Sequence, residues 1–232
     1  MAIAFDAESN SGTTGWPAAG TSTLTWSHTC TGSNRILIVG VGLYAQDNIV
    51  TTTSGVTYNG VAMTLINSIS GTADALKQDT SLWYLINPAT GANNIVATSS
   101  RAIQYHWGGG TSYTGVTQSS PIDSSATGQS GATGSTAATS LTVSTIVLTN
   151  NCWLVGTVFA RGGTPAAGTG TTIRSANAAP SAGGGDSNAI VSTGSQSLQW
   201  TSASGAYPGA IVASIKPTAT YGTSRMLMGV GM

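Results

Sequence analysis

Few residues of this chain could carry out chemistry, and their spacing matches no catalytic arrangement. The two histidines are His28, two residues before Cys30, and His106, which lies between Tyr105 and Trp107. A zinc site needs three or four ligands, and His28 with Cys30 supplies two, so Cys152 would have to join them by folding. Neither histidine has a serine or cysteine partner in the sequence, and the Gly-x-Ser-x-Gly motif of hydrolases is absent. We therefore expect no metal, no cofactor and no enzymatic activity.

The acidic residues are scattered along the chain. A glycosidase requires two carboxylates at a defined separation, and acids spread this widely can form such a pair by accident. No Asp-x-Asp-x-Asp-Gly pattern indicates a calcium loop. The glycine runs at 108–110 and 183–185 lack the strand-to-helix context and the lysine of a phosphate-binding loop. The acids are Asp6, Glu8, Asp47, Asp74, Asp79, Asp123 and Asp186.

The composition is unusual because only 6% of the 232 residues are charged and the formal net charge is zero. Ordinary soluble domains are about 25% charged. Without a basic patch we expect no nucleic-acid or membrane partner. A net charge near zero also removes long-range repulsion between copies, which favours self-association.

The elements that must position these residues read as β-strands, because apolar residues alternate or are β-branched and turn residues recur. We expect an all-β fold, an antiparallel β-sandwich resembling a jelly roll, with one domain over 1–217. Ser/Thr/Gly-rich segments 118–139 and 161–188 read as long loops or weak strands. The expected strands are Ile3–Asp6, Thr23–His28, Arg35–Tyr44, Val56–Tyr58, Ala62–Ser68, Ser81–Asn87, Asn94–Thr98, Ile103–Trp107, Ser140–Leu148, Cys152–Ala160, Ala189–Thr193, Ser197–Ser202 and Ala210–Lys216.

Several local features refine this picture. Asn59-Gly60 predicts a type I′ hairpin turn, since both central residues of that turn need positive φ. The run 87–91 (Asn-Pro-Ala-Thr-Gly) predicts a tight turn between strands. The segments 35–44 and 152–160 are apolar throughout, which predicts central strands buried on both faces. Residues 73–79 are the only helix-like stretch.

The sequence also contains an internal similarity. Leu24-Thr-Trp-Ser27 followed by Asn34 and Val39-Gly40 resembles Leu141-Thr-Val-Ser144 followed by Asn150 and Val155-Gly156. Either an old duplication of a sheet unit or chance in a chain of low complexity explains the match. The two cysteines, Cys30 and Cys152, either form one disulfide or remain separate buried thiols.

Two groups of residues are candidate contact sites. Tyr105, Trp107 and Tyr113 could stack on a sugar ring, or they could shield a loop or a contact between subunits. The tail 218–232 is rich in methionine, which fills irregular grooves. It either caps its own core or docks on a neighbouring copy through Met226, Leu227, Met228, Val230 and Met232.

The sequence resembles β-sandwich virion proteins of tailed bacteriophages. The resemblance rests on the segments 24–28, 34–40, 56–61, 82–91 and 211–217 and spans about residues 20–217. It implies a jelly-roll-like protein exposed on a particle, as a capsid decoration or a head or tail appendage. Its partners would be other copies of itself, capsid proteins or tail proteins, and its location the virion, after synthesis in the host cytoplasm without a signal peptide. The alternative function is a carbohydrate-binding module for attachment to a host or another surface.

Overall fold

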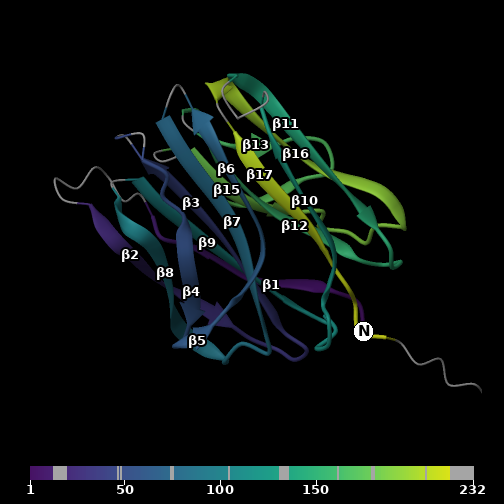
Figure 1. The fold of residues 1–232 in the computed structure, drawn as a ribbon. Coiled ribbons are helices and arrows are strands. Elements are labelled where there is room, and N and C mark those ends of the chain that lie inside the picture. The colour runs from purple at the N-terminus through teal and green to yellow at the C-terminus, as the bar shows by residue number, and fades with distance from the viewer. Residues whose placement is uncertain are drawn as a thin grey trace, which may run out of the picture.

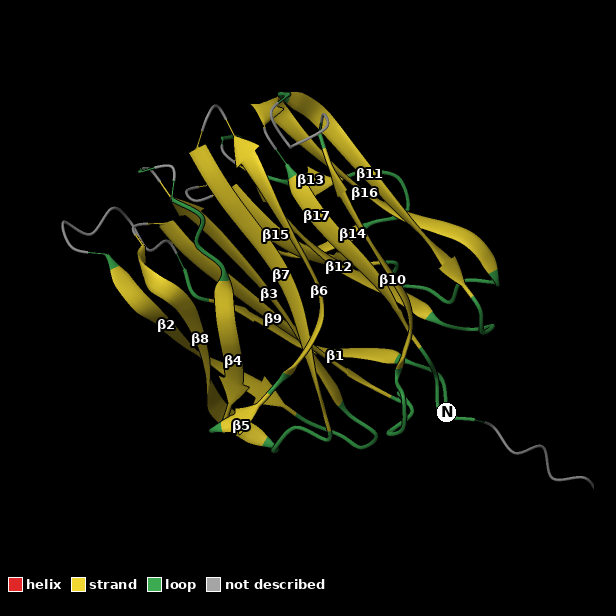
Figure 2. Ribbon diagram, viewed as in Figure 1, coloured by secondary structure: helices red, strands yellow, loops and turns green. Residues whose placement is uncertain are grey.

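The computed structural model describes residues 1–12, 20–45, 47, 49–73, 76–103, 105–130, 136–160, 162–178, 181–206 and 208–219. These residues form strands and turns and contain no helix (Figure 2). Every strand pairing is antiparallel. The strands are β1 Ala4–Asn10, β2 Thr21–Cys30, β3 Ile36–Ala45, β4 Thr53–Tyr58, β5 Val61–Ala62, β6 Thr64–Ala73, β7 Leu76–Ile86, β8 Gly91–Ile103, β9 Tyr105–Thr114, β10 Ile122–Gln129, β11 Ala138–Val147, β12 Trp153–Ala160, β13 Ala166–Ala167, β14 Thr172–Ala178, β15 Ser181–Asp186, β16 Gly194–Ala206 and β17 Gly209–Ile215.

The strands form four sheets that stack as four layers (Figure 1). Outer sheet 1 has the order β2-β8-β4-β5 and packs on inner sheet 1, whose order is β1-β9-β3-β7-β6. Inner sheet 2, β10-β17-β12-β15-β14, packs on the other face of inner sheet 1. Outer sheet 2, β11-β16-β13, closes the stack. Three apolar cores therefore lie between four sheets, in a sandwich-like arrangement.

The central strands β3 and β12 are buried along their whole length. Each lies in the middle of an inner sheet and has a second sheet on both faces, so it has no solvent side to fill with polar residues. This confirms the prediction that the two apolar segments 35–44 and 152–160 form central strands. In β3, Val39 and Val41 join the first core, while Ile36 and Ile38 join the middle core.

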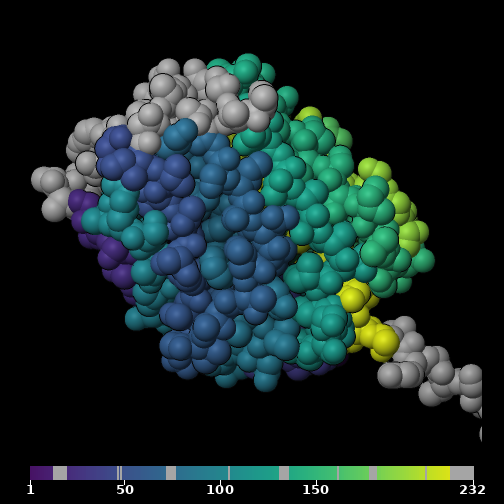
Figure 3. Space-filling model, viewed as in Figure 1, coloured from purple at the N-terminus to yellow at the C-terminus, as the bar shows by residue number. Residues whose placement is uncertain are grey.

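The two halves of the chain repeat the same topology. Unit 1 (β1–β9) and unit 2 (β10–β17) each have an inner sheet of five strands. In chain order these are β1, β3, β6, β7 and β9 in unit 1 and β10, β12, β14, β15 and β17 in unit 2. When they are matched in that order, the two sheets have the same arrangement, β1-β9-β3-β7-β6 and β10-β17-β12-β15-β14. The outer sheets correspond in the same way, except that unit 2 has no described strand matching β5. Figure 3 shows unit 2, in green and yellow, beside the blue strands of unit 1.

Three of the four register irregularities described in unit 1 are repeated in unit 2; the shift in β4 between Thr53 and Gly55 is not. The bulge between Phe5 and Ala7 in β1 has its counterpart between Ile122 and Ser124 in β10. The shift between Thr21 and Thr23 in β2 recurs between Ala138 and Ser140 in β11, and the shift in β6 recurs in β14. Bulges are specific local features of a strand pair, so their recurrence at matching positions shows that the two units repeat one strand register, as a duplicated sheet unit predicts.

The register corrects the pairing read from the sequence. Cys30 pairs with Gly91 in unit 1, and the equivalent pair in unit 2 is Val147 with Gly194. Counting back along β2 and β11 from these pairs, Leu24 matches Leu141, as predicted. Asn34, however, matches Asn151 rather than Asn150, and both have positive φ. Aligning the two Val-Gly pairs was wrong by one residue, and a shift of one residue exchanges the two faces of a strand.

The two units face each other across a pseudo-twofold axis that runs along β3 and β12. β3 lies over β12, β6 over β10, and β1 over β14, which reverses the strand order between the two inner sheets. Gly40 of β3 lies against Thr157, and Gly42 lies against the ring of Phe159. In the strand register, Gly40 corresponds to Thr157 and Gly42 corresponds to Phe159, so each glycine faces its own counterpart.

The two predicted tight turns are present in the structure. Asn59 and Gly60 both have positive φ between β4 and β5, and Asn87 and Gly91 frame the turn between β7 and β8, so both turns are confirmed. The helix over 73–79 is wrong, because Ala73 ends β6 and Leu76 begins β7. The strand over 189–193 is wrong too, since only Val191 makes a bridge there. Within the predicted domain over 1–217, the strands form two repeated units.

Candidate functional site

The structure brings Ser9 and His28 together on β1 and β2. The Ser9 hydroxyl lies 2.8 Å from Nδ1 of His28. His28 is 1% exposed, and burial lowers its pKa to about 4 although the nearby Asp6 opposes the shift. A serine–histidine–acid relay needs an acid on the second ring nitrogen, yet Nε2 of His28 is buried without a hydrogen-bond partner among the described residues. The pair is a core contact, and sequence reasoning missed it because strand pairing alone brings the two residues together.

The remaining candidates for chemistry are separated in the fold. His106 is buried in β9, and burial lowers its pKa to about 4. Cys30 lies in the core of unit 1 and Cys152 in the core of unit 2, and both are free thiols. Within the described ranges, no group of three or more His, Cys, Asp or Glu residues could hold a metal.

The aromatic platform proposed for sugar binding does not lie on the surface. Trp107 and Tyr113 are both 0% exposed, because β9 turns them toward inner sheet 2. Trp107 belongs to the same buried cluster as Phe159, and Tyr113 makes an edge-to-face contact with Trp153 at 6.0 Å. Only Tyr105 is partly exposed. Trp107 and Tyr113 therefore hold the two units together, which corrects the prediction of an exposed stacking surface.

Many of the few charged residues serve the fold. Asp6, in the bulge of β1, accepts hydrogen bonds from the backbone N–H of Thr31 at 2.9 Å and from the hydroxyls of Thr31 and Ser112. Burial alone would raise the pKa of Asp6, but these hydrogen bonds lower it overall. Asp6 thus fastens the loop between β2 and β3.

Asp123 does the same in unit 2. It accepts hydrogen bonds from the backbone N–H of Leu148 at 2.6 Å and from the hydroxyl of Thr149 at 2.7 Å. Ser214, the counterpart of Ser112, donates a longer bond of 3.4 Å. These bonds outweigh burial and lower the pKa of Asp123.

A polar corner joins the two units. Arg174 of β14 pairs with Asp186 of β15 at 2.8 Å, and the hydroxyl of Tyr113 donates to the same carboxylate at 2.8 Å. The guanidinium of Arg174 also lies 4.1 Å from the centre of the Phe5 ring. The counterparts at the opposite corner are Ile66, Tyr84, Ile215 and Ile122, which pack in the apolar middle core. Duplication thus left one polar corner and one apolar corner.

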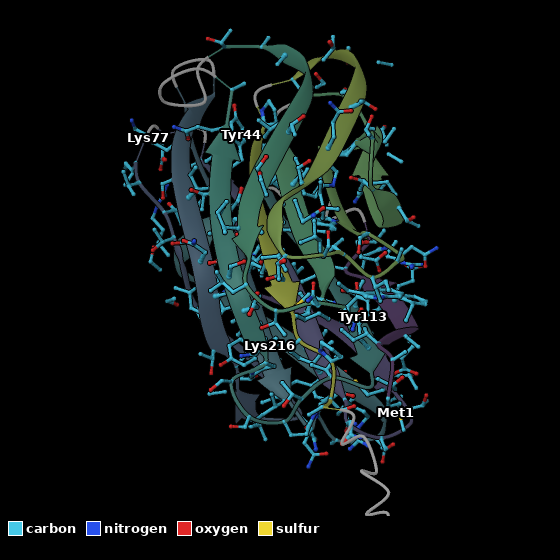
Figure 4. The ribbon with its side chains drawn as sticks, turned by 90° about the vertical axis from the view of Figure 1, so that its right-hand side faces the viewer. Met1, Tyr44, Lys77, Tyr113 and Lys216 are labelled. Atoms are coloured by element: carbon cyan, nitrogen blue, oxygen red, sulfur yellow. The ribbon has the colours of Figure 1, made fainter. Side chains whose placement is uncertain are left out.

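A groove runs across the end of the molecule where β17 leads into the tail. One part, about 380 Å³, is lined by the loop 149–151, by residues 216–219 and by Thr117 and Ser119. An adjoining hollow of about 210 Å³ is lined by Met1, Ala2, Asn151, Ile190, Pro217 and Thr218. Figure 4 shows Met1 and Lys216 toward this end, whereas Tyr44 and Lys77 lie toward the other. We call this feature the base groove.

The predicted tail contacts Met226, Leu227, Met228, Val230 and Met232 lie outside the described residues. Up to Ala219, the structure therefore shows where the tail begins. It begins in the wall of the base groove, because Ala219 is one of the lining residues.

Comparisons with known protein families, with curated proteins and with solved structures return no match. Among the described residues, no helix is long and apolar enough to cross a membrane. The resemblance to phage virion proteins therefore remains a prediction from the sequence.

Proposed function

We propose that the protein is a virion structural protein, a capsid decoration or a head or tail appendage, that acts by self-association or by attachment to a capsid lattice. We further propose that each unit is a jelly roll. The order β1-β9-β3-β7 facing β2-β8-β4-β5 supports this, since a jelly roll has eight strands in two sheets that the chain visits alternately. Viral capsid domains use this architecture, as do lectins and cupins.

The observation that carries the proposal is the chemistry of the two outer sheets. Outer sheet 1 exposes Thr23, Thr25 and Ser27, and outer sheet 2 exposes their counterparts Ser140, Thr142 and Ser144. These faces point away from each other because the pseudo-twofold axis lies between them. Uncharged hydroxyl faces carry no like-charge repulsion and can pack against neighbouring subunits in a lattice.

The internal use of charge supports the same role. Arg174 and Asp186 pair inside the molecule, Arg101 and Asp47 pair at 2.5 Å, and Asp6 and Asp123 fasten loops. Few charges are left to direct contacts at long range. We therefore expect attachment to depend on shape and hydrogen bonding rather than on ion pairs.

The carbohydrate-binding alternative loses its motivating observation, because Trp107 and Tyr113 are buried. An enzymatic role gains nothing from Ser9 and His28, since their geometry provides no relay. We retain the structural role as the conclusion.

The test is to purify the particles of the phage whose genome encodes this sequence and to look for the protein in them. We expect it to sediment with intact particles and to remain bound from about 0.1 M to about 1 M NaCl, where surface charges become fully screened. Immunogold labelling of the particles would give its position. Absence from purified particles, or release by moderate salt, would contradict the proposal.

A further inference from the structure

The duplication provides an internal reference for the base groove. After β9, the chain leaving unit 1 lies against the loop between β2 and β3. The backbone N–H of Val116 donates to the carbonyl of Asn34 at 3.0 Å, and the amide of Gln118 donates to the carbonyl of Arg35 at 3.1 Å. Val116 is fully buried. In unit 1, therefore, residues 116–118 fill the space beside this loop.

In unit 2 the equivalent segment takes another path. Pro217 and Thr218 are the counterparts of Gly115 and Val116, as the matched pairs of β9 and β17 require. Proline has no N–H to donate, and the N–H of Thr218 bonds to the carbonyl of Gly115 at 2.8 Å instead. The Thr218 hydroxyl donates to the carbonyl of Met1 at 3.2 Å. The chain leaving unit 2 is thus held against unit 1, away from its own loop 149–151.

The base groove is the space that this change of path leaves open. Its walls are the loop 149–151 on one side and residues 216–219 on the other. Its surroundings include exposed apolar side chains, which are the groups that a docked segment would cover. These are Met1 at 59%, Leu148 at 69% and Ile190 at 58% exposure.

We propose that the base groove binds residues 220–232 of a second copy of this chain. The inference deepens the proposed self-association by naming the receiving surface, and it rests on that function. The segment carries the apolar residues Met226, Leu227, Met228 and Val230, of which the methionines adapt to irregular grooves. Unit 1 shows that a chain segment fits beside such a loop.

The position of the groove favours a second copy over the chain's own tail. Residues 216–219, from which the tail continues, form one wall of the groove and are held against unit 1 by the hydrogen bond from Thr218 to Gly115. A segment of this length spans at most about 45 Å when extended, which is enough to reach a neighbour placed end to end. Each copy offers one segment and one groove, so reciprocal exchange closes as a twofold dimer.

The test uses the full chain and two variants that disable opposite partners. Ile190→Glu places a charge in the groove, and Leu227→Asp places one in the segment. We expect the wild type to dimerise and each variant to dimerise at least about tenfold more weakly, measured by sedimentation over a range of concentrations. An equimolar mixture of the two variants should dimerise more strongly than either variant alone and more weakly than the wild type, because the mixed dimer keeps one of the two contacts intact.

The matched control is Val61→Glu, which changes a similarly exposed apolar residue (53%) on the hairpin between β4 and β5. It should dimerise like the wild type, and thermal unfolding should show that all three variants are folded. A monomeric wild type, equal weakening by Val61→Glu, or no recovery in the mixture would overturn the inference. Each of these results leaves the proposed function standing if the protein is still found on particles.

Discussion

Asp6 and Asp123 occupy the same bulge in the two units and fasten the same loop. Each carboxylate accepts a backbone N–H and a threonine hydroxyl from the loop that follows the first strand of its outer sheet. A bulge frees one residue from the ladder and redirects its side chain. The duplicated unit thus retains a specific polar contact although most side chains around it differ.

We expect Asp6→Ala and Asp123→Ala each to lower the free energy of unfolding by about 1–2 kcal/mol, because each removes hydrogen bonds to a charged group. Urea unfolding monitored by tryptophan fluorescence would measure the change. Glu8→Ala, an exposed acid on the same strand as Asp6, is the control and should change stability little. If all three variants unfold alike, the two carboxylates do not fasten their loops.

Asp79 should make the free energy of unfolding fall as pH rises. It is 2% exposed, and burial raises its pKa although Ser70 and Thr53 donate hydrogen bonds to it. An acid whose pKa is higher in the folded state destabilises the fold as pH rises from its unfolded pKa, about 3.9, through the folded value. We expect Asp79→Asn to remove this loss, as measured by unfolding at a series of pH values. A constant difference between variant and wild type would contradict it.

Asp6 and Asp123 have lowered pKa values, so their contribution should be complete above about pH 4 and lost as pH falls further. Unfolding Asp6→Ala and Asp123→Ala at the same series of pH values separates this effect from that of Asp79. The difference in free energy of unfolding between each alanine variant and the wild type should shrink in acid, in the range where the carboxylates become protonated.

The contact between Gly42 and Phe159 should tolerate no added atom. A Cβ at position 42 would lie 1.9 Å from Cδ2 of Phe159. We expect Gly42→Ala to cost about 1–3 kcal/mol through overpacking, whereas Gly55→Ala, with nothing within 4 Å, should cost little. In the Phe159→Ala background the cost of Gly42→Ala should fall, which a double-mutant cycle would detect. Additive costs would show that the two residues do not constrain each other.

Removing the carboxylate from the polar corner should lower the free energy of unfolding more than replacing the corner with the residues of its apolar counterpart. Asp186→Ala leaves Arg174 and the Tyr113 hydroxyl without their carboxylate, and we expect a loss of about 3–5 kcal/mol. The triple replacement Arg174→Ile, Asp186→Tyr and Tyr113→Ile copies the opposite corner, which has Ile66, Tyr84 and Ile215. It should cost less than Asp186→Ala, as measured by chemical unfolding. The reverse order would mean that the ion pair itself contributes most of the stability there.

The cysteines should react slowly in the folded protein. Burial raises the pKa of Cys30 and raises that of Cys152 to about 12, and the thiolate is the reactive form. We expect alkylation at pH 8 to require unfolding and the mass to be unaffected by reductant. Rapid labelling of the native protein would contradict the burial of both thiols.

The sequence predicts β3 and β12 well, because ten and eight consecutive buried residues leave an apolar run that no other element explains. It also predicts the turn at Asn59-Gly60, where backbone geometry restricts residue choice. It does not resolve β14 and β15, which lie in a segment that reads as long loops or weak strands. The run Ser-Ala-Gly-Gly-Gly-Asp of β15 has no pattern of its own and becomes a strand only through pairing with β12 and β14.

The candidate site was less predictable for the same reason. Trp107 precedes Gly108 and Gly109, which suggests an exposed loop edge when read along the chain. Its burial depends on inner sheet 2, whose strands lie beyond residue 120 and were partly unrecognised. The base groove is likewise formed by residues 1–2, 117, 119, 149–151, 190 and 216–219, which only the tertiary fold brings together.

The contact between Gly42 and Phe159 is one that a single chain with two units allows and a dimer of identical chains does not. In a dimer of identical chains, a residue that faces its own counterpart across the axis must have the same size as that counterpart. Two glycines there would leave a void and two phenylalanines would collide. Joining both halves in one polypeptide removes that restriction, so one half can supply the space and the other the ring. It also keeps the halves paired at any dilution, since their encounter no longer depends on protein concentration.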